Sequence, residues 1–354
     1  MGEMHHFPAD RAALLAALFP DGVPRLWSPS LFFYDGQGGF DRARQEAHLA
    51  FMAPHVKGFL IPGSTGDAWE MGDDETIAAL DLAIDFAAPR GIDLLAGVLR
   101  PDAASMGALL GRLIRRICER AGTDSTPQAF AACRIRGITV APPTTKAPLS
   151  QAGIAEALSP IFARGLPMAL YQLPQVTGNR MTPELVAELA ARFPNFLFFK
   201  DSGGADEVAS SGLLPPELVL LRGAEGDYAR WHQALGGPYH GFLLSTANAF
   251  PGELAGILDA LREGRPEVAR ARSALLSAVV ADAFAAVQEL SHGNAFTNAN
   301  KALSHAMAFG PDARIAPPPR LHAGPGLPRE MVGQVVASLE RNGLLPGRGY
   351  LGTP

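Results

Sequence analysis

The stretch Phe196-Leu197-Phe198-Phe199-Lys200-Asp201-Ser202-Gly203-Gly204 indicates the kind of sheet on which this chain is built. An unbroken apolar run is typical of a strand buried on both faces, as in a parallel sheet or barrel. The run leads directly into Lys200, whose charge is costly to bury unless it is paired or used. Burial favours the neutral amine, which is the nucleophile that forms a Schiff base with a carbonyl compound. The structural alternative is a lysine that extends from the strand end into solvent.

Short apolar stretches of this kind alternate with amphipathic stretches along the chain. The predicted strands are 25–33, 58–61, 93–98, 137–141, 168–171, 196–200, 218–222 and 241–245. The predicted helices between them are 41–55, 73–89, 102–120, 150–164, 182–193, 203–212, 225–236 and 247–263. Eight strand–helix units in series favour an α/β fold of the (β/α)8 TIM-barrel type. An open doubly wound sheet is the main rival, but no predicted strand is followed by its Gly-x-Gly-x-x-Gly turn.

The regions outside the alternating pattern divide the chain into three parts. We predict an N-terminal extension at 1–24 with a short helix at 10–19, a barrel at 25–264, and a C-terminal helical region at 265–354. The C-terminal region contains helical patterns at 265–290, 297–309 and 328–343. An insert at 117–136 lengthens the connection between the third helix and the fourth strand.

Composition excludes several classes of function. The chain has 354 residues, 47% of them apolar, and a net charge of −5, which gives no electrostatic case for nucleic acid or an anionic membrane. Two cysteines cannot form a disulfide framework or a thiolate zinc cluster, and a metal site is not expected. No stretch reaches 18 consecutive apolar residues, and the first residues do not resemble a signal peptide. We therefore expect a cytoplasmic protein with no membrane partner.

Catalytic groups of a barrel lie at the C-terminal ends of its strands. After the second strand, the turn Gly63-Ser64-Thr65-Gly66-Asp67 can direct backbone N–H groups and two hydroxyls at a carboxylate, although glycine-rich turns also simply cap helices. At the end of the fifth strand, Tyr171 is placed to act as a general acid/base near Lys200, or as a core tyrosine.

Two further strand ends carry polar residues. The eighth strand ends in Ser245-Thr246-Ala247-Asn248, which suits a pocket wall and also suits helix capping. Arg100, at the end of the third strand, is positioned to meet an anionic substrate, and an exposed arginine is the structural alternative.

Taken together, four motifs in this order resemble the dihydrodipicolinate synthase / N-acetylneuraminate lyase family of class I aldolases, over about 25–310. Gly63-Ser64-Thr65-Gly66-Asp67 is similar to the family's Gly-[Ser/Thr]-Thr-Gly-Glu turn, and Tyr171-Gln172-Leu173-Pro174 to its Tyr-Asn-x-Pro. Phe199-Lys200-Asp201-Ser202-Gly203 resembles the Schiff-base segment. The eighth strand, 242–248, completes the set.

The resemblance implies a catalytic Lys200 that forms an imine with pyruvate or another 2-oxo acid, and a catalytic Tyr171 that transfers the proton. It also implies that Gly63, Ser64, Thr65 and Ser245 bind the substrate. No metal or organic cofactor is implied, because the imine itself withdraws electrons from the neighbouring carbon. The family further suggests a homo-oligomer, either a dimer or a tetramer.

Two departures from the family pattern bear on the substrate. Val176 stands where lysine-pathway synthases carry an arginine, and Pro142-Pro143-Thr144-Thr145 replaces their Pro-Tyr-Tyr-Asn, so that Thr144 lacks the relay phenol. The expected activity is therefore C–C cleavage or formation on a 2-oxo acid, with a 2-keto-3-deoxy sugar acid as the favoured substrate class. A dehydratase using the same imine and a catalytically silent 2-oxo-acid-binding barrel are the alternatives.

Overall fold

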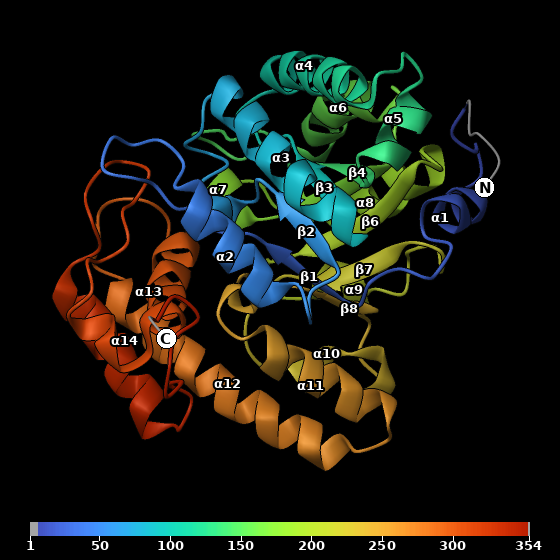
Figure 1. Ribbon diagram of the computed structural model, residues 1–354. Coiled ribbons are helices and arrows are strands. Elements are labelled where there is room, and N and C mark those ends of the chain that lie inside the picture. Colours follow the sequence, from blue (N-terminus) through green and yellow to red (C-terminus); the bar gives the residue numbers. More distant parts are fainter. Residues whose placement is uncertain (1–5, 353–354) are drawn as a thin grey trace.

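The computed structural model describes residues 6–352, in which eight parallel strands form a closed barrel in the order β1 to β8. This confirms the predicted (β/α)8 barrel (Figure 1). The strands are β1 (Leu26–Pro29), β2 (Gly58–Ile61), β3 (Asp93–Gly97), β4 (Ile135–Val140), β5 (Met168–Gln172), β6 (Phe196–Asp201), β7 (Val219–Arg222) and β8 (Gly241–Leu243). Every residue of β6 is buried, as its apolar run predicts.

Helices cover the outside of the barrel and continue beyond it. Those before the C-terminal region are α1 (Arg11–Leu18), α2 (Arg42–Met52), α3 (Asp73–Ala87), α4 (Ala103–Ala121), α5 (Thr126–Ala132), α6 (Gln151–Phe162), α7 (Pro174–Thr177), α8 (Pro183–Arg192), α9 (Glu207–Ser210), α10 (Tyr228–Trp231) and α11 (Pro251–Arg262). The C-terminal helices are α12 (Pro266–Val287), α13 (Ala295–Phe309) and α14 (Arg329–Arg341). Short 3-10 turns include η1 (Ser64–Gly66), η2 (Ala88–Arg90), η3 (Gln233–Leu235), η4 (Ser245–Asn248) and η5 (Gly310–Arg314).

The helices predicted at 203–212 and 225–236 are wrong, because the chain forms only the single turns α9, α10 and η3 there. Gly204, Gly212, Gly226 and Gly236 all have φ between 72° and 83°. A helix cannot continue through a left-handed residue. Gly204 and Gly226 lie before α9 and α10, and Gly212 and Gly236 lie after α9 and η3, so the left-handed glycines confine each region to single turns. The insert at 117–136 contains the end of α4 and the separate helix α5.

The N-terminal end of the barrel is closed by α1 and the residue that follows it. The ring centroid of Phe19 lies 5.6 Å from that of Phe198 and 6.3 Å from that of Trp27, both in edge-on contact. The guanidinium of Arg11 donates to the carbonyl of Phe196 over 2.8 Å, which attaches α1 to the start of β6. Strand-end side chains therefore meet at the opposite, C-terminal end.

The C-terminal helices gather on one side of the barrel, where Figure 1 shows them in orange and red. Helix α12 packs along α10 and α11, and α13 packs against η1 and η4. Since η1 follows β2 and η4 follows β8, α13 lies at the C-terminal end of the barrel. Within residues 6–352, no helix combines the length and apolar character needed to cross a membrane. The division of the chain into three parts at 24/25 and 264/265 stays a prediction. Residues 1–5 of the first part and 353–354 of the last part lie outside the residues that the structure describes.

Candidate active site

Lys200 lies at the end of β6 with only 4% of its surface exposed. It is paired in register with Tyr171 on the neighbouring strand β5, and its Nζ lies 3.9 Å from the centroid of the Tyr171 ring. Burial lowers the pKa of Lys200 to about 7, although the negative charge of Glu225 partly opposes this shift. Near neutral pH a large fraction of the amine is therefore uncharged, as a nucleophile requires.

Space for the Lys200 side chain depends on Gly223, which follows β7. A Cβ on Gly223 would lie 2.6 Å from Cε of Lys200 and 2.1 Å from Oγ of Ser202. Both distances are too short for a real Cβ contact, so a side chain at this position would require Lys200 and Ser202, or the loop itself, to shift. Gly223 thus allows the backbone after β7 to approach the amine, and the same contact places Ser202 beside it.

Tyr171 is buried at the end of β5. Burial raises the pKa of its phenol far above the ordinary value, and the carboxylates of Glu225 and Asp201 add to the rise while the Ser202 hydroxyl opposes it. The phenol is therefore protonated at neutral pH. A neutral phenol in contact with an amine can exchange a proton with an atom bound between them.

The turn that follows β2 forms η1, and both Ser64 and Thr65 are buried in it. The carbonyl oxygens of both residues accept hydrogen bonds from the Thr297 hydroxyl of α13, over 3.3 and 3.0 Å. The first N–H groups of a helical turn lack acceptors within the turn, so they are the groups that an anion can meet. Ser64 Oγ also accepts from Trp69 Nε1 over 3.1 Å.

Asp67 anchors this turn to the C-terminal region. It adopts φ of 60° and accepts hydrogen bonds from the Tyr34 hydroxyl over 2.9 Å and from Lys301 Nζ over 3.0 Å. Lys301 belongs to α13 and is completely buried. Lys301 was not predicted from the sequence, although a lysine inside the otherwise apolar and neutral segment 295–309 was a signal for a buried ion pair.

Ser245 lies in η4, where its hydroxyl donates to Oε1 of Glu225 over 2.5 Å. Thr246 donates to the same carboxylate through its N–H over 3.1 Å and through its hydroxyl over 2.5 Å. The hydroxyl of Tyr228 adds a fourth donor over 2.9 Å. The structure therefore places Ser245 in a network around Glu225, a residue that the sequence analysis did not select. The sequence feature that could have selected Glu225 is an acidic residue just after a predicted strand, between Gly223 and Gly226.

Arg100 is neither exposed nor available to a substrate, which corrects both interpretations drawn from the sequence. Only 8% of its surface is exposed, and its guanidinium donates to Asp73 Oδ1 over 3.0 Å and to the Thr76 hydroxyl over 2.9 Å. It also donates to the carbonyls of Ala68 and Leu99. These partners use up its donors, so Arg100 holds α3 against the end of β3.

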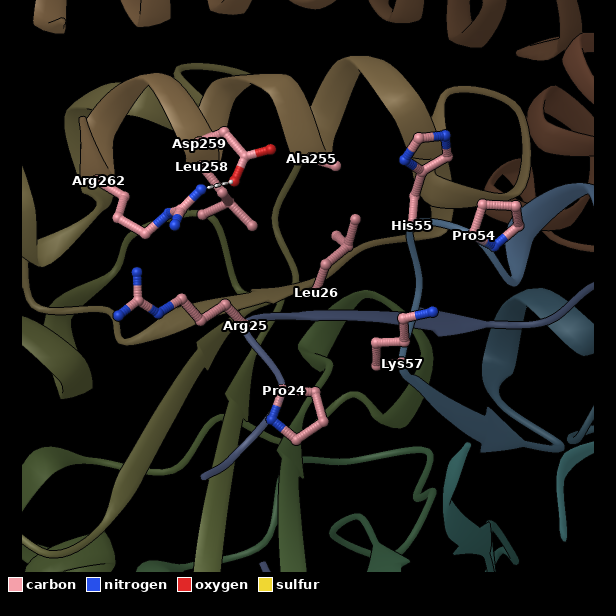
Figure 2. Close-up of a pocket in the computed structure, with 10 residues that line it drawn as sticks. All are labelled: Pro24, Arg25, Leu26, Pro54, His55, Lys57, Ala255, Leu258, Asp259 and Arg262. Carbon is pink, nitrogen blue, oxygen red and sulfur yellow. Dashed lines mark hydrogen bonds and ion pairs between the residues drawn. The ribbon is translucent and has the colours of Figure 1, made fainter. Parts of the chain in front are cut away.

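A separate pocket lies at the other end of the barrel, and Figure 2 shows the side chains that line it. Arg25 and Lys57 immediately precede β1 and β2, while Arg262 of α11 pairs with Asp259 over 2.9 Å. The charged groups of this pocket therefore lie far along the strands from Lys200. Within residues 6–352, no group of three or more His, Cys, Asp or Glu side chains is arranged to hold a metal ion.

A buried amine beside a phenol at the C-terminal end of a (β/α)8 barrel is the arrangement expected of an aldolase-type barrel enzyme. A family model described as the dihydrodipicolinate synthetase family matches residues 130–292. The 4-hydroxy-tetrahydrodipicolinate synthase of Xanthomonas axonopodis pv. citri (strain 306) is 31% identical over 225 residues, which cover 63% of this chain and 67% of that protein. The chain belongs to the dihydrodipicolinate synthetase family. It is therefore a class I aldolase-type lyase, in a family whose general chemistry is a covalent lysine Schiff base.

Solved structures agree with the fold. YagE, a prophage protein of the dihydrodipicolinic acid synthase family from E. coli K12 in complex with pyruvate, matches with a TM-score of 0.68 and 21% identity, covering 91% of this chain and 99% of that one. A variant of the Sulfolobus solfataricus 2-keto-3-deoxygluconate aldolase matches with a TM-score of 0.67 and 16% identity, covering 90% and 96%. At these identities the likeness concerns the barrel and its helical extension.

Proposed function

We propose that Lys200 forms an imine with C2, the carbonyl carbon of a 2-oxo acid, and that the enzyme makes or breaks the C3–C4 bond of that acid. The observation that carries the proposal is the buried position of Lys200 in contact with Tyr171, with a pKa lowered to about 7. The amine adds to the carbonyl and water leaves, which gives a protonated imine. When the C3–C4 bond breaks, its electrons enter the imine as an enamine, and an aldehyde is released.

The remaining residues have positioning and proton-transfer roles in this proposal. Tyr171 exchanges the proton with the C4 oxygen as the C3–C4 bond breaks or forms. The turn at Gly63, Ser64 and Thr65 holds the carboxylate of the 2-oxo acid through N–H groups and hydroxyls. Ser245 acts through Glu225, whose carboxylate it donates to. No metal or organic cofactor takes part.

Lysine-pathway condensation is not the reaction that we propose. Val176 is apolar where the family's synthases carry a cation, and it packs with Tyr171 and Leu173 at the mouth of the barrel. Thr144 cannot supply the phenol that relays protons in those enzymes. Pyruvate with aspartate semialdehyde should consequently give little or no condensation product. Water loss without release of pyruvate would identify the dehydratase alternative.

The test is reduction of the enzyme with borohydride in the presence of pyruvate, followed by peptide mass spectrometry. We expect a stable pyruvyl adduct on Lys200, and no adduct in Lys200→Ala. Lys57→Ala serves as the matched control, because Lys57 is exposed before β2 and should leave the adduct intact. If neither pyruvate nor longer 2-oxo acids give an adduct on Lys200, the proposed function is wrong and the silent barrel takes its place.

The proposed assembly is a closed homo-oligomer, as a dimer or tetramer. Light scattering coupled to size-exclusion chromatography measures its mass directly, and a particle of 37.3 kDa would contradict it.

A further inference from the structure

A pocket of about 320 Å³ lies between the loops after β5, β6 and β7 and the first two C-terminal helices. On its outer side it is lined by Val280, Ala281 and Phe284 of α12 and by Phe296 of α13. The rings of Phe284 and Phe296 meet edge-on, with centroids 5.4 Å apart. These four side chains offer apolar surface, and Ser277 of α12 adds one hydroxyl to the same side.

The inner side of the pocket reaches the proposed reaction centre. Ser202 and Glu225 line it, and Ser202 lies two residues beyond Lys200 on the same chain segment. A Cβ built on Gly223 would touch both Ser202 Oγ and Lys200 Cε, which places these two atoms side by side. The pocket therefore begins at Ser202, next to the amine, although Lys200 itself does not line it. A group attached to the carbon that reacts there would extend into it.

Two further polar side chains of the pocket, Glu225 and Ser277, are engaged within the protein, whereas the exposed amide of Gln175 at the rim donates only to the carbonyl of Ser202, over 2.9 Å. The four donors around Glu225 occupy both of its carboxylate oxygens, two on each. The Ser277 hydroxyl donates to the carbonyl of Ser273 over 2.7 Å and accepts from the N–H of Asp227 over 3.0 Å. A substrate hydroxyl would have to break these bonds or stay unpaired, which is costly in a buried site.

The mouth of the barrel is similarly poor in free polar groups. The side-chain amide of Gln172 donates to the carbonyl of Met181 over 3.0 Å and accepts from the N–H of Met181 over 2.9 Å. The apolar cluster at the mouth consists of Ala68, Leu99, Ala141, Tyr171 and Leu173, with Trp69, Val176 and Phe296 packed against it. Phe296 belongs to both this cluster and the pocket wall, so the apolar surface is continuous.

Ser202 is different. Within the part of the chain that the structure describes, its buried Oγ makes no bond of full hydrogen-bond geometry, although it lies close enough to the Tyr171 phenol to lower the pKa of that group. An unpaired buried hydroxyl beside the amine can bind one polar group of a ligand. An aldol adduct of pyruvate carries one such group, the hydroxyl on C4, which is the former aldehyde carbon.

We infer that the substrate carries an apolar substituent, aryl or alkyl, beyond C4, and that the Phe284–Phe296 pocket binds it. This inference rests on the proposed function, and it differs from the sugar-acid class that the sequence favours. In the direction of synthesis, C3 of the enamine bonds to the aldehyde carbon, and the aldehyde oxygen takes a proton through Tyr171. Water then hydrolyses the imine, which restores the Lys200 amine and releases a 4-hydroxy-2-oxo acid with the apolar group on C4.

The size of the pocket fits this class of substituent. An apolar cavity of about 150 Å³ accepts a benzene molecule. The pocket of about 320 Å³ thus has room for a phenyl ring or a short alkyl chain. Edge-on contacts between the two phenylalanine rings and an aryl group are also favourable in themselves.

The experiment measures kcat/KM for C–C bond formation from pyruvate with two aldehydes, benzaldehyde and glyceraldehyde. We expect benzaldehyde to be preferred by about tenfold or more, the discrimination that apolar pockets commonly reach. Hexanal tests the alkyl case in the same assay and should also exceed glyceraldehyde. Borohydride trapping of pyruvate on the same preparations reports imine formation separately.

The variant Phe284→Ser places a hydroxyl in the pocket wall on a half-buried helix position. We expect kcat/KM with benzaldehyde to fall about tenfold or more, while the pyruvyl adduct still forms. Leu275→Ser is the matched control, because Leu275 lies on the same helix, is 40% exposed and is outside the pocket. It should change neither quantity.

An error in the apolar-substituent inference and an error in the proposed function would give different results in these assays. If pyruvate is trapped but glyceraldehyde reacts as well as or better than benzaldehyde and hexanal, the apolar-substituent inference is overturned and the proposed function stands. The apolar-substituent inference is also overturned if pyruvate is trapped on Lys200 and none of the three aldehydes reacts. A loss of benzaldehyde activity in Phe284→Ser equal to that in Leu275→Ser also overturns it. Absence of any imine with 2-oxo acids instead removes the proposed function.

Discussion

Lys200 Nζ lies 3.9 Å from the centroid of the Tyr171 ring, on the adjacent strand of the same barrel. The amine meets the face of the ring, and both groups are buried. Near pH 7 about half of the lysine is neutral while the phenol keeps its proton, so the pair supplies one nucleophile and one acid under the same conditions. Nucleophilic attack and proton transfer are therefore separable by mutation.

The substitution Tyr171→Phe should keep the ring against Lys200 and remove only the hydroxyl. We expect the pyruvyl adduct to be trapped as in the wild type, while turnover falls by about 10²–10⁴, the usual contribution of a positioned acid or base. Single-turnover trapping and steady-state assays of the same preparation measure the two effects. Normal turnover would show that the tyrosine only packs.

The pH dependence of imine formation follows from the lowered pKa of Lys200. The neutral amine attacks the carbonyl, and its fraction rises as pH passes through the folded-state pKa. Because burial lowers that pKa from 10.5 to about 7, the trapping rate with pyruvate should rise with a midpoint near pH 7 and level off above about pH 8. Rates measured between about pH 5.5 and 9.5 test this. A rate that still increases tenfold per pH unit at the upper end would contradict the buried environment.

Features that depend on local pattern could be predicted from the sequence. The unbroken apolar runs locate β2 at 58–61 to the residue and β6 to within one residue. Strand order and side-chain parity were enough to predict that Tyr171 and Lys200 lie close together. These predictions succeed because parallel strands bury both faces and end at one edge of the barrel.

Features that depend on long-range contacts could not be predicted in the same way. Ser245 meets a carboxylate 20 residues before it, and Lys301 meets one 234 residues before it. Both contacts depend on loop conformation and on how α13 docks, neither of which leaves a periodic pattern. The helices at 203–212 and 225–236 failed because amphipathic composition does not reveal which glycines are left-handed.

The substitution Gly223→Ala tests the close approach of the loop after β7 to Lys200. The added Cβ would lie 2.6 Å from Lys200 Cε, so the lysine must move or the loop must shift. We expect pyruvate trapping to slow at least about tenfold and the free energy of unfolding to drop by about 1–3 kcal/mol, as for other overpacked sites.

The matched control for that variant is Gly111→Ala in α4. A Cβ at Gly111 meets nothing within 4 Å, and alanine is the better helix former by about 0.5–1 kcal/mol. The control should therefore keep full trapping and be at least as stable as the wild type. Equal trapping by both glycine variants would mean that Lys200 has more room than this structure gives it.

The ion pair between Lys301 and Asp67 provides the last prediction. The two side chains are 0% and 3% exposed, and they join α13 to the turn that contains Ser64 and Thr65. Lys301→Met would leave Asp67 buried without its countercharge, so we expect a loss of about 3–5 kcal/mol in the free energy of unfolding and a raised KM for pyruvate. Denaturant unfolding and steady-state kinetics measure the two quantities.

The double variant Lys301→Met/Asp67→Asn distinguishes two causes of instability, the unpaired charge of Asp67 and the weaker packing of α13 against the turn. Removing both charges relieves the unpaired carboxylate, so the double variant should be more stable than Lys301→Met alone. If KM for pyruvate also returns toward the wild-type value, the ion pair acts on the substrate only by holding the turn in place. If the double variant is as unstable as the single one, the Asp67 carboxylate is not what makes Lys301 necessary. The apolar stem of Lys301 in α13 would then be the part that stabilises the fold.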